Sequence, residues 1–428
     1  MNATHAHTER FEADYLIETP FDPAQVAEIM AGEQSSGTFV RVANETDALR
    51  ERSRAQVIHI AELEPASRPS LSNAFLTRKG VTGPWRRAIV TLSFPVSNVG
   101  ANLPTLAATV SGNLYDLGEV TGMRLLTLRL PAAYRQRFDM PVHGVRGTRA
   151  ITGVARGAMI GTIIKPNVGM GTEETALLVR GLCEAGVDFI KDDEVCANPE
   201  HAPLDARVRA VMKEVRAYRD RAGRHVMVAF NITDDLDAMR RHAELIEAEE
   251  GSCVMASINW CGFSAIQALR RSTGLVLHAH RNGYGMMSRD ESLGMSFQAY
   301  QTLWRLAGVD HMHVHGLQGK FAQTDQEVIE SAQACATPLT ADIEDRVLPA
   351  FSSGQWAGTV PATFAATQSD DLLFMSGGGI LAHPDGPQAG VLSVRQAWQA
   401  VTDGVTLEQF AKDAPELRTA LAFFGGRA

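Results

Sequence analysis

Eight short apolar runs lie beyond residue 150, and their regular spacing constrains the fold more than any other feature of the sequence. Amphipathic, helix-like stretches such as 173–186, 204–220 and 234–250 lie between these runs. A repeated strand-then-helix order predicts parallel strands joined by helical crossovers, and eight such units close a barrel. We therefore expect an α/β chain in which residues 136–428 form a (β/α)8 TIM barrel. The expected strands are residues 158–164, 187–193, 225–232, 253–259, 275–280, 309–315, 347–351 and 372–376.

Residues 1–135 have a different pattern, which predicts a smaller α+β N-terminal domain ahead of the barrel. A helix is expected at 23–33, and alternating or apolar runs predict the strands of an antiparallel sheet. The segments PAAYRQRF and PVHGVRG are rich in residues that interrupt regular structure and mark the crossing between the domains. The expected strands are residues 39–43, 56–63, 87–95 and 124–130.

Charge and cysteine content disfavour several classes of protein. The net charge is -9 with both signs interspersed, so neither nucleic acid nor a membrane surface is expected as a partner. A small anionic substrate is compatible, because local cations and backbone amides bind phosphate. The five cysteines lack CxxC spacing, which argues against a disulfide framework or a structural zinc site. Because the sequence shows no secretion signal and no apolar run of ~18 residues, we expect a cytoplasmic protein.

The run Lys191-Asp192-Asp193-Glu194 directly follows an apolar strand. Alternate residues of a strand point to the same side, so Lys191 and Asp193 are expected to face inward together. Carboxylates at a strand end favour a hard cation such as Mg²⁺, which prefers about six oxygen ligands. An amine is a poor ligand for Mg²⁺, but a carbamate formed on it with CO₂ would supply oxygen. The alternative interpretation is an exposed loop with an incidental run of charges.

Histidines alternate along two of the expected strands. Arg281 adjoins one set and Lys320 follows the other, which favours a role in acid–base chemistry or phosphate binding. The alternative is a set of histidines packed inside the barrel, and zinc binding is disfavoured because no third ligand with metal spacing accompanies them. The histidines are His278, His280, His311, His313 and His315.

A Ser-Gly-Gly-Gly sequence at 376–379 follows the last expected strand. Backbone amides that lead into a short helix can bind a phosphate, and glycine allows the phosphate to approach closely. Glycine-rich turns are also common without any such function. The G-x-G-x-x-G pattern is absent, so a dinucleotide site is not indicated.

Several segments, in this order and spacing, resemble the barrel of the RuBisCO large subunit. A further segment, GEQSSGTF, resembles the substrate loop of that family's N-terminal domain. The similarity covers nearly the whole chain and is closest to the RuBisCO-like, non-carboxylating form IV proteins. The barrel segments are GTIIKPNVGM, FIKDDE, LHAHR, DHMHVHGLQGK, VLPAFSSG and SGGGILAHPDG.

The resemblance implies a metal site and acid–base residues. Lys191 would be the carbamylated lysine, and its carbamate would bind Mg²⁺ together with Asp193 and Glu194. Lys165 would be the enolising base or its proton partner, and His280 a second acid or base.

It also implies two phosphate sites and a shared active site. Lys320 would reach over the substrate from a mobile loop, and Glu33 would be its partner from a neighbouring subunit. The assembly would therefore be a homodimer, or an assembly of dimers, with shared active sites. One phosphate site would contain Arg281, His313 and Ser352, and the other Thr38, Gly354, Gly377 and Gly378.

The sequence departs from carboxylating members of the family. Asn167, expected to contact substrate, replaces a lysine whose charge would help to hold an enediolate or a CO₂-derived carboxylate. Genuine CO₂ fixation is therefore disfavoured. Further departures are Phe39 for tryptophan, Ser353 for glycine, Tyr284 for histidine and Thr105 for asparagine.

The retained residues imply a Mg²⁺-dependent enzyme that forms an enediolate from a phosphorylated keto sugar acid. The favoured reaction is decarboxylation or hydrolysis of 3-oxo-isoapionate 4-phosphate. The first alternative is a 2,3-diketo-5-methylthiopentyl-1-phosphate enolase or a methylthioribulose-phosphate isomerase. A true ribulose-bisphosphate carboxylase and a non-catalytic regulatory protein are further alternatives; buried charges that are costly to keep argue against the latter.

Overall fold

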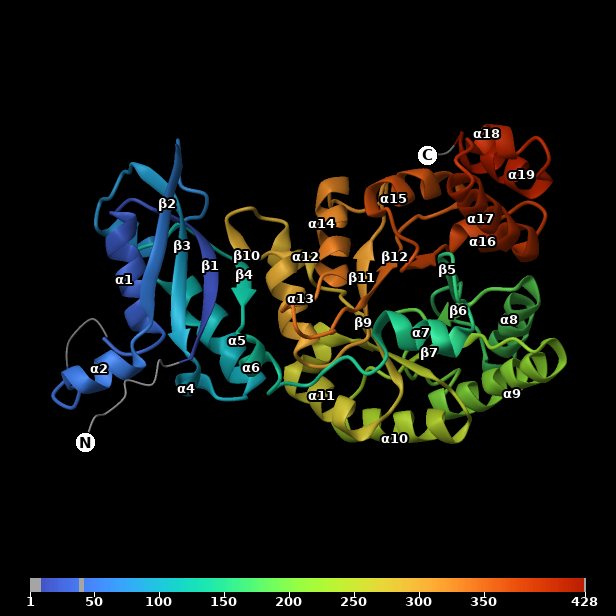
Figure 1. Cartoon of the computed structure of the whole chain (residues 1–428), viewed down its shortest axis with the longest axis horizontal. Helices are drawn as coiled ribbons and strands as arrows, with labels where there is room; N and C mark the ends of the chain where they lie inside the picture. Colours follow the sequence, from blue (N-terminus) through green and yellow to red (C-terminus); the bar gives the residue numbers. More distant parts are fainter. Residues whose placement is uncertain (1–8, 38–41, 427–428) are drawn as a thin grey trace. The chain divides into compact units, whose positions relative to one another are not determined.

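The computed structural model describes residues 9–37 and 42–426, which divide into two compact units (Figure 1). The N-terminal unit contains the described residues up to Asp139 together with Gly283–Ala307 and Pro338–Glu344. The barrel unit contains Met140–Asn282, Gly308–Thr337 and the chain from Asp345 onward. Two segments from the C-terminal two thirds of the sequence are therefore part of the N-terminal unit.

The N-terminal unit is built on a five-stranded sheet in the order β10-β4-β1-β3-β2. Its neighbours pair antiparallel, except that β10 pairs parallel with β4. The strands are β1 (Arg10–Thr19), β2 (Gln56–Ala66), β3 (Trp85–Pro95), β4 (Gly122–Arg129) and β10 (Leu293–Met295). The helices are α1 (Pro23–Glu33), α2 (Asp47–Ser53), α3 (Ala74–Arg78), α4 (Val96–Val99), α5 (Leu103–Ser111), η1 (Asn113–Asp116), α6 (Ala132–Arg135), α12 (Gly285–Ser288) and α13 (Phe297–Arg305).

The expected helix at 23–33 is confirmed as α1, which begins with Pro23 after the side chain of Asp22 caps the amide of Ala24. The strands expected at 56–63, 87–95 and 124–130 are confirmed within β2, β3 and β4. The prediction of a strand at 39–43 is wrong for residues 42 and 43, the part of it that the structure describes. There Val42 accepts a hydrogen bond from the amide of Glu45, which forms a turn around Asn44, a residue type that favours turns.

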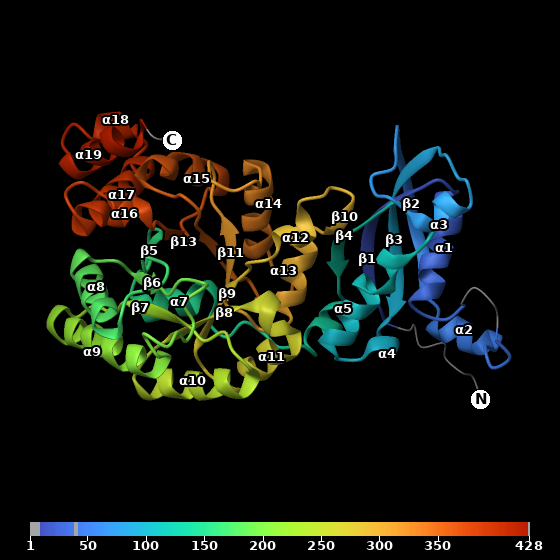
Figure 2. The ribbon, with the colours of Figure 1, turned by 180° about the vertical axis from the view of Figure 1, so that it is seen from behind.

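The barrel unit is a closed barrel of parallel strands in the order β5-β6-β7-β8-β9-β11-β12-β13, and all eight expected strands are confirmed. Helices α8 to α11 lie outside the strands on one side, and α14, α15 and α17 on another (Figures 1 and 2). The strands are β5 (Met159–Ile163), β6 (Phe189–Lys191), β7 (Met227–Asn231), β8 (Cys253–Ser257), β9 (Val276–His280), β11 (His311–His315), β12 (Leu348–Phe351) and β13 (Leu373–Met375). The helices are α7 (Gly144–Thr152), α8 (Thr172–Ala185), α9 (Leu204–Ala222), α10 (Leu236–Ala248), α11 (Ile258–Ser272), α14 (Asp325–Ala336), η2 (Ala357–Thr359), α15 (Val360–Thr367), α16 (Gly378–Leu381), α17 (Pro387–Thr402), α18 (Leu407–Phe410) and α19 (Pro415–Phe424).

Two buried aspartates stabilise the barrel where strands β6 and β11 begin. Asp310 accepts hydrogen bonds from the amides of His143, Gly144 and Leu277 and pairs with Arg270 at 2.9 Å. Asp188 accepts from the amide of a β5 residue and pairs with two arginines, Arg224 and Arg395. Charges buried this deeply persist because each is paired and hydrogen-bonded. Because both lie at the N-terminal ends of strands, the opposite ends are left for the polar residues of the site.

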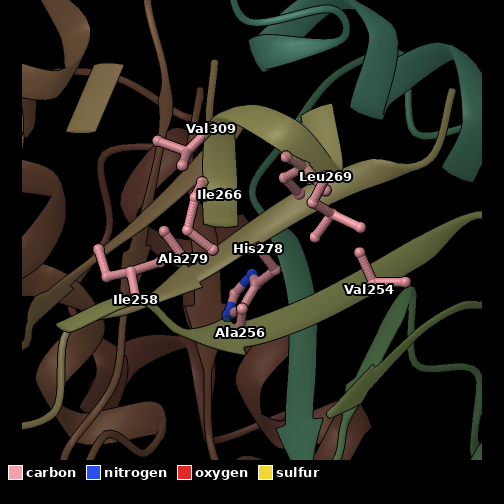
Figure 3. A pocket seen from close by; sticks show the side chains of 9 residues that line it. Val254, Ala256, Ile258, Ile266, Leu269, His278, Ala279 and Val309 are labelled. Atoms are coloured by element: carbon pink, nitrogen blue, oxygen red, sulfur yellow. The ribbon is translucent and has the colours of Figure 1, made fainter. Parts of the chain in front are cut away.

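A small apolar cavity lies between β8, β9 and α11 (Figure 3). Its volume of about 10 Å³ leaves room for at most one water molecule, so we interpret it as a gap in packing rather than a substrate site. No helix in the described part of the chain is both long and apolar enough to cross a lipid bilayer. The lining side chains include Val254, Ile258, Ile266, Leu269 and Val309.

Candidate active site

Polar residues gather where the parallel barrel strands end. β6 ends at Lys191, with the acidic residues 192–194 directly after it, and β9 ends at His280. β5 ends two residues before Lys165, and β12 ends directly before Ser352. Because the C-terminal ends of all eight strands meet at one end of the barrel, these side chains share a single region of space.

Lys165 is held by two acceptors. Its Nζ donates to Oδ2 of Asp193 at 2.7 Å and to Oδ1 of Asn167 at 2.6 Å. The Asp193 side chain is almost fully buried, whereas that of Lys165 is 39% exposed. The ammonium group is therefore fixed at the end of β5 while one side of it stays open to a bound molecule.

Lys191 is buried beneath this pair. Its Nζ donates to the carbonyl of Asp192 at 2.7 Å and lies 3.5 Å from Oε2 of Glu194. Burial lowers the pKa of Lys191. The charges of the nearby carboxylates, that of Glu194 most, raise it in part. Burial raises the pKa of Glu194, but the charges of Lys191 and Lys165 and the hydrogen bonds to its carboxylate together outweigh burial, so that the pKa is lowered overall.

His280 completes this group of charges. Its Nε2 lies 3.5 Å from Oε2 of Glu194. Burial, followed by the charge of Lys191, lowers the pKa of His280 to about 3, so the ring is neutral at physiological pH. A neutral imidazole with one bare nitrogen can accept a proton from a reacting molecule.

The alternation expected for residues 191–194 is present in the structure. Asp193 faces Lys165, whereas Asp192 points the other way and pairs with Arg207 at 3.1 Å. Asp192 also accepts a hydrogen bond from the amide of Asn231, and burial raises its pKa. Of the two aspartates, only Asp193 therefore faces the site; Asp192 joins β6 to β7 and α9.

His313 and Ser352 lie beside His280. The rings of His280 and His313 have centroids 4.4 Å apart. Nδ1 of His313 is 3.2 Å from the Ser352 hydroxyl, and its Nε2 is 2.7 Å from Nε2 of His278. Both nitrogens of His313 are thus engaged within the barrel, and a phosphate contact from His313 would replace one of these bonds.

Arg281 and Lys320 come from the segments that follow β9 and β11. Arg281 is buried, and its Nη2 donates to Oε1 of Gln323 at 2.6 Å. Lys320 is exposed, with its Nζ 5.3 Å from the centre of the Phe321 ring. A Cβ at Gly354, where φ is +86°, would lie 3.8 Å from the backbone nitrogen of Lys320. The loop that carries Lys320 therefore runs beside the turn after β12.

The remaining expected residues lie elsewhere. Gly377 and Gly378 follow β13 at the start of α16, and the position of a Cβ at Gly378 is open. Glu33 ends α1 in the N-terminal unit, where its Oε1 accepts a hydrogen bond from Asn113 at 3.4 Å. Thr38 and Phe39 lie outside the described residues.

The sequence matches two parts of one protein family. Residues 144–424 match the catalytic domain of the ribulose bisphosphate carboxylase large chain, and residues 13–134 match its N-terminal domain. The chain belongs to the RuBisCO large-chain family. The resemblance stated from the sequence motifs is thereby confirmed.

Similar proteins place the chain among the RuBisCO-like members of the family. It is 47% identical to a 3-oxo-isoapionate-4-phosphate transcarboxylase/hydrolase of Xanthobacter autotrophicus, with 97% of this chain and all of that protein covered. It is 42% identical to a 3-oxo-isoapionate-4-phosphate decarboxylase of Rhizobium rhizogenes, over 96% of this chain and 97% of that one. A crystal structure of a RuBisCO-like protein from Burkholderia fungorum is 74% identical and matches 97% of this chain and all of that chain with a TM-score of 0.93.

Three of the departures from carboxylating RuBisCO fall on described residues with visible structural roles. Asn167 supplies one of the two acceptors that hold Lys165. Ser353 has a φ of +70°, a conformation that favours the glycine of carboxylating members. Tyr284 donates to the carbonyl of Met295 at 3.3 Å within the N-terminal unit. Among the described departures, Asn167 contacts Lys165, and the Ser353 hydroxyl lies 3.4 Å from that of Ser352.

Two groups that support the site belong to no sequence motif. Gln323 accepts a hydrogen bond from Arg281, and no strand or glycine pattern marks it. Thr148 on α7 contacts His311 at 2.7 Å, far along the sequence from any motif. Packing inside the barrel was the alternative interpretation of the alternating histidines, and His278 and His311 do contact each other there, with their Nδ1 atoms 3.1 Å apart.

Proposed function

We propose that this chain is a Mg²⁺-dependent enzyme that acts on 3-oxo-isoapionate 4-phosphate, a phosphorylated keto sugar acid. The observation that carries the proposal is the group formed by Lys191, Asp193, Glu194, Lys165 and His280 at the strand ends. The names of the relatives in Xanthobacter and Rhizobium support the substrate, because these proteins match almost the whole chain.

The chemistry of the donor set fits a Mg²⁺ site that depends on a modified lysine. Among residues 9–37 and 42–426, no three His, Cys, Asp or Glu side chains form a metal-binding group. Asp193 and Glu194 supply two carboxylates, and each faces a lysine nitrogen. A carbamate on Lys191 would add the missing oxygen ligand and would turn a repelling ammonium into an anion. The lowered pKa of Lys191 favours the neutral amine that reacts with CO₂.

The group also suits control of protons on an enolisable substrate. When bound, Mg²⁺ would act as a Lewis acid toward the ketone oxygen and stabilise the negative charge that develops there. Lys165 holds protons on Nζ and keeps one side open, so it can return a proton to carbon after bond cleavage. His280 lies 3.5 Å from Oε2 of Glu194, and a carbamate on Lys191 would remove the ammonium that, after burial, most lowers the pKa of His280, so that the ring could take up a proton.

Residues around this group suit an anionic substrate. Arg281 supplies a fixed cation, and the amides near Gly377 and Gly378 can donate to a phosphate. The backbone of Lys320 runs beside Gly354, so the loop that carries Lys320 could cover a bound molecule. By resemblance we assign Ser352 and His313 to the same substrate region, and Thr38 to the second of the family's two phosphate-binding regions.

We further propose a homodimer, or an assembly of dimers, in which Glu33 of one subunit completes the site of its neighbour beside Lys320. The resemblance to RuBisCO supports this arrangement. Glu33 suits the role because it ends α1 with one oxygen bound only weakly, at 3.4 Å from Asn113. A sedimentation velocity experiment that found only the 46.3 kDa monomer at micromolar concentration would contradict it.

Two outcomes of the reaction are possible with the same residues. In decarboxylation, the bond to the carboxyl carbon breaks, CO₂ leaves, and the electron pair passes to the ketone oxygen as an enediolate. In the transcarboxylase/hydrolase alternative, the carboxyl group first moves to the ketone carbon, which leaves a ketone on the carbon that carried it. Water then adds to this new ketone and the bond between the two carbons breaks, which gives phosphoglycerate and glycolate. Lys165 or His280 would supply the proton for carbon in either case.

The test is ³¹P and ¹³C NMR of the protein with Mg²⁺, bicarbonate and 3-oxo-isoapionate 4-phosphate. Erythrulose phosphate and CO₂ would establish a decarboxylase, whereas phosphoglycerate and glycolate would establish a hydrolase. An unchanged substrate would contradict the proposal and direct attention to methylthio-sugar phosphates, the substrates of the enolase and isomerase alternative.

A further inference from the structure

Five side chains form one series of hydrogen bonds through the interior of the barrel, which we call the histidine chain. It runs from Ser352, beside the site, through His313, His278 and His311 to Thr148 on α7. The successive distances are 3.2, 2.7, 3.1 and 2.7 Å. All five side chains are buried, so each depends on its neighbours for hydrogen bonds.

The direction of these bonds is fixed at Thr148. Its hydroxyl lies 2.6 Å from the carbonyl oxygen of Gly144 and 2.7 Å from Nε2 of His311. A carbonyl oxygen can only accept, and a threonine hydroxyl has only one proton to donate. That proton must go to Gly144, so Nε2 of His311 carries a proton and donates it to the Thr148 oxygen.

The remaining protons follow in order. His311 is neutral with a bare Nδ1, which accepts from Nδ1–H of His278. His278 then has a bare Nε2, which accepts from Nε2–H of His313. His313 in turn has a bare Nδ1, which accepts from the hydroxyl of Ser352.

A positive charge on any ring would break the series. A cationic imidazole has protons on both nitrogens, so it would face a neighbour that also presents a proton. Burial lowers the pKa of all three rings, which agrees with neutral histidines. The middle ring, His278, is therefore protonated on Nδ1, and the two outer rings on Nε2.

We propose that Thr148 is a positioning residue for the site, which fixes the hydroxyl of Ser352 from the far end of the histidine chain. Ser352 donates its only proton inward, so its hydroxyl oxygen is left to accept from another donor, on the side where the Ser353 hydroxyl lies at 3.4 Å. This assignment does not depend on which reaction the site catalyses. It gives Thr148, His278 and His311 a role that nothing in the motif analysis assigned to them.

The neighbouring Thr152 offers a matched control. It lies one turn further along α7 and is also buried, and its hydroxyl donates to the carbonyl of Thr148. Thr152→Val therefore removes a buried hydroxyl from the same helix but leaves the histidine chain intact. Thr148→Ser keeps the hydroxyl, whereas Thr148→Val removes it with little change in shape.

The experiment is long-range ¹H–¹⁵N correlation NMR of full-length protein labelled with ¹⁵N-histidine. The expected spectrum has His278 protonated on Nδ1 and both His311 and His313 on Nε2. Thr148→Ser and Thr152→Val should keep that pattern, and Thr148→Val should lose it. A proton on Nε2 of His278 in the unaltered protein would overturn the proposal. A folded Thr148→Val variant with an unchanged pattern of ring protons would also overturn the proposal. If that variant does not fold, loss of the pattern in Thr148→Ser, which keeps the hydroxyl, would overturn it instead.

Discussion

Nζ of Lys165 lies 2.7 Å from Oδ2 of Asp193, and this contact joins the end of β5 to the end of β6. It brings a half-exposed ammonium against a buried carboxylate that also faces the proposed metal position. One residue that handles protons and one that would bind Mg²⁺ are therefore positioned by the same contact.

Removing the Lys165 amine should stop turnover and leave the fold intact. Lys165→Met is expected to lower kcat by roughly 10²- to 10⁴-fold, the usual contribution of a positioned acid or base. Thermal unfolding should move less than on loss of a fully buried cation, because the Lys165 side chain is 39% exposed and the charge of Lys191 still acts on the buried Asp193. Steady-state assays and a melting curve check both expectations, with exposed Lys213→Met on α9 as the control. Full activity in Lys165→Met would remove this residue from the proposed mechanism.

Asn167 should act through Lys165. Asn167→Ala leaves the amine with Asp193 alone, so we expect kcat to fall about five- to tenfold, the effect of one hydrogen bond of about 1 kcal/mol. KM should change less than kcat, because the amine remains in place but is less well oriented. Exposed Asn44→Ala is the control. A change in KM alone would instead indicate that Asn167 only binds substrate.

Acid should destabilise the barrel through its buried histidines. Burial lowers the pKa of His311 to about 4 and the pKa values of His278 and His313 well below 6.5. As pH falls below about 6.5, the histidines of the unfolded chain therefore bind protons that those of the folded chain do not. The free energy of unfolding decreases as pH falls from about 6.5 toward the lower pKa values of the folded protein. Each ring should reduce the free energy of unfolding by roughly 1 kcal/mol between about pH 7 and about pH 5.5.

Urea unfolding followed across this pH range tests that expectation. Replacement of the exposed His59 by glutamine should leave the slope unchanged. A free energy of unfolding that stays constant from neutral to mildly acidic pH would show that the buried rings are not neutral in the folded protein.

The buried pair Arg270–Asp310 should be essential for the barrel. Arg270→Met leaves Asp310 with amide partners but no countercharge, and we expect about 3–5 kcal/mol of destabilisation, as for other broken buried pairs. Arg209 forms a comparable pair with Glu249 at an exposed position, so Arg209→Met should change stability by less than about 1 kcal/mol. Chemical denaturation distinguishes the two; equal effects would contradict the assigned role.

Much of the fold could be predicted because the signal was periodic. The eight barrel strands and α1 followed from apolar spacing and breakers. Strand β1 was missed, although Phe11, Ala13, Tyr15 and Ile17 alternate and are all buried, so the same rule would have found it. The short strand β10 could not be found, because three residues carry no period and its pairing with β4 crosses a long stretch of sequence.

The candidate site was predictable in its residue types but not in its contacts. Strand alternation separated Asp193 from Asp192, and the structure agrees. The partner of Lys165, the anchor of the histidine chain at Thr148 and the contact between Arg281 and Gln323 depend on tertiary geometry. No local pattern contains that information.

The most direct test of the central claim is whether turnover of 3-oxo-isoapionate 4-phosphate requires both Mg²⁺ and Lys191. After treatment with a chelator, the unaltered protein should regain activity with Mg²⁺ and bicarbonate. Lys191→Ala and Lys191→Arg should not regain it, because neither can carry the carbamate, although the arginine keeps the buried charge. Undiminished activity in a folded Lys191 variant, or turnover without any divalent cation, would contradict the account.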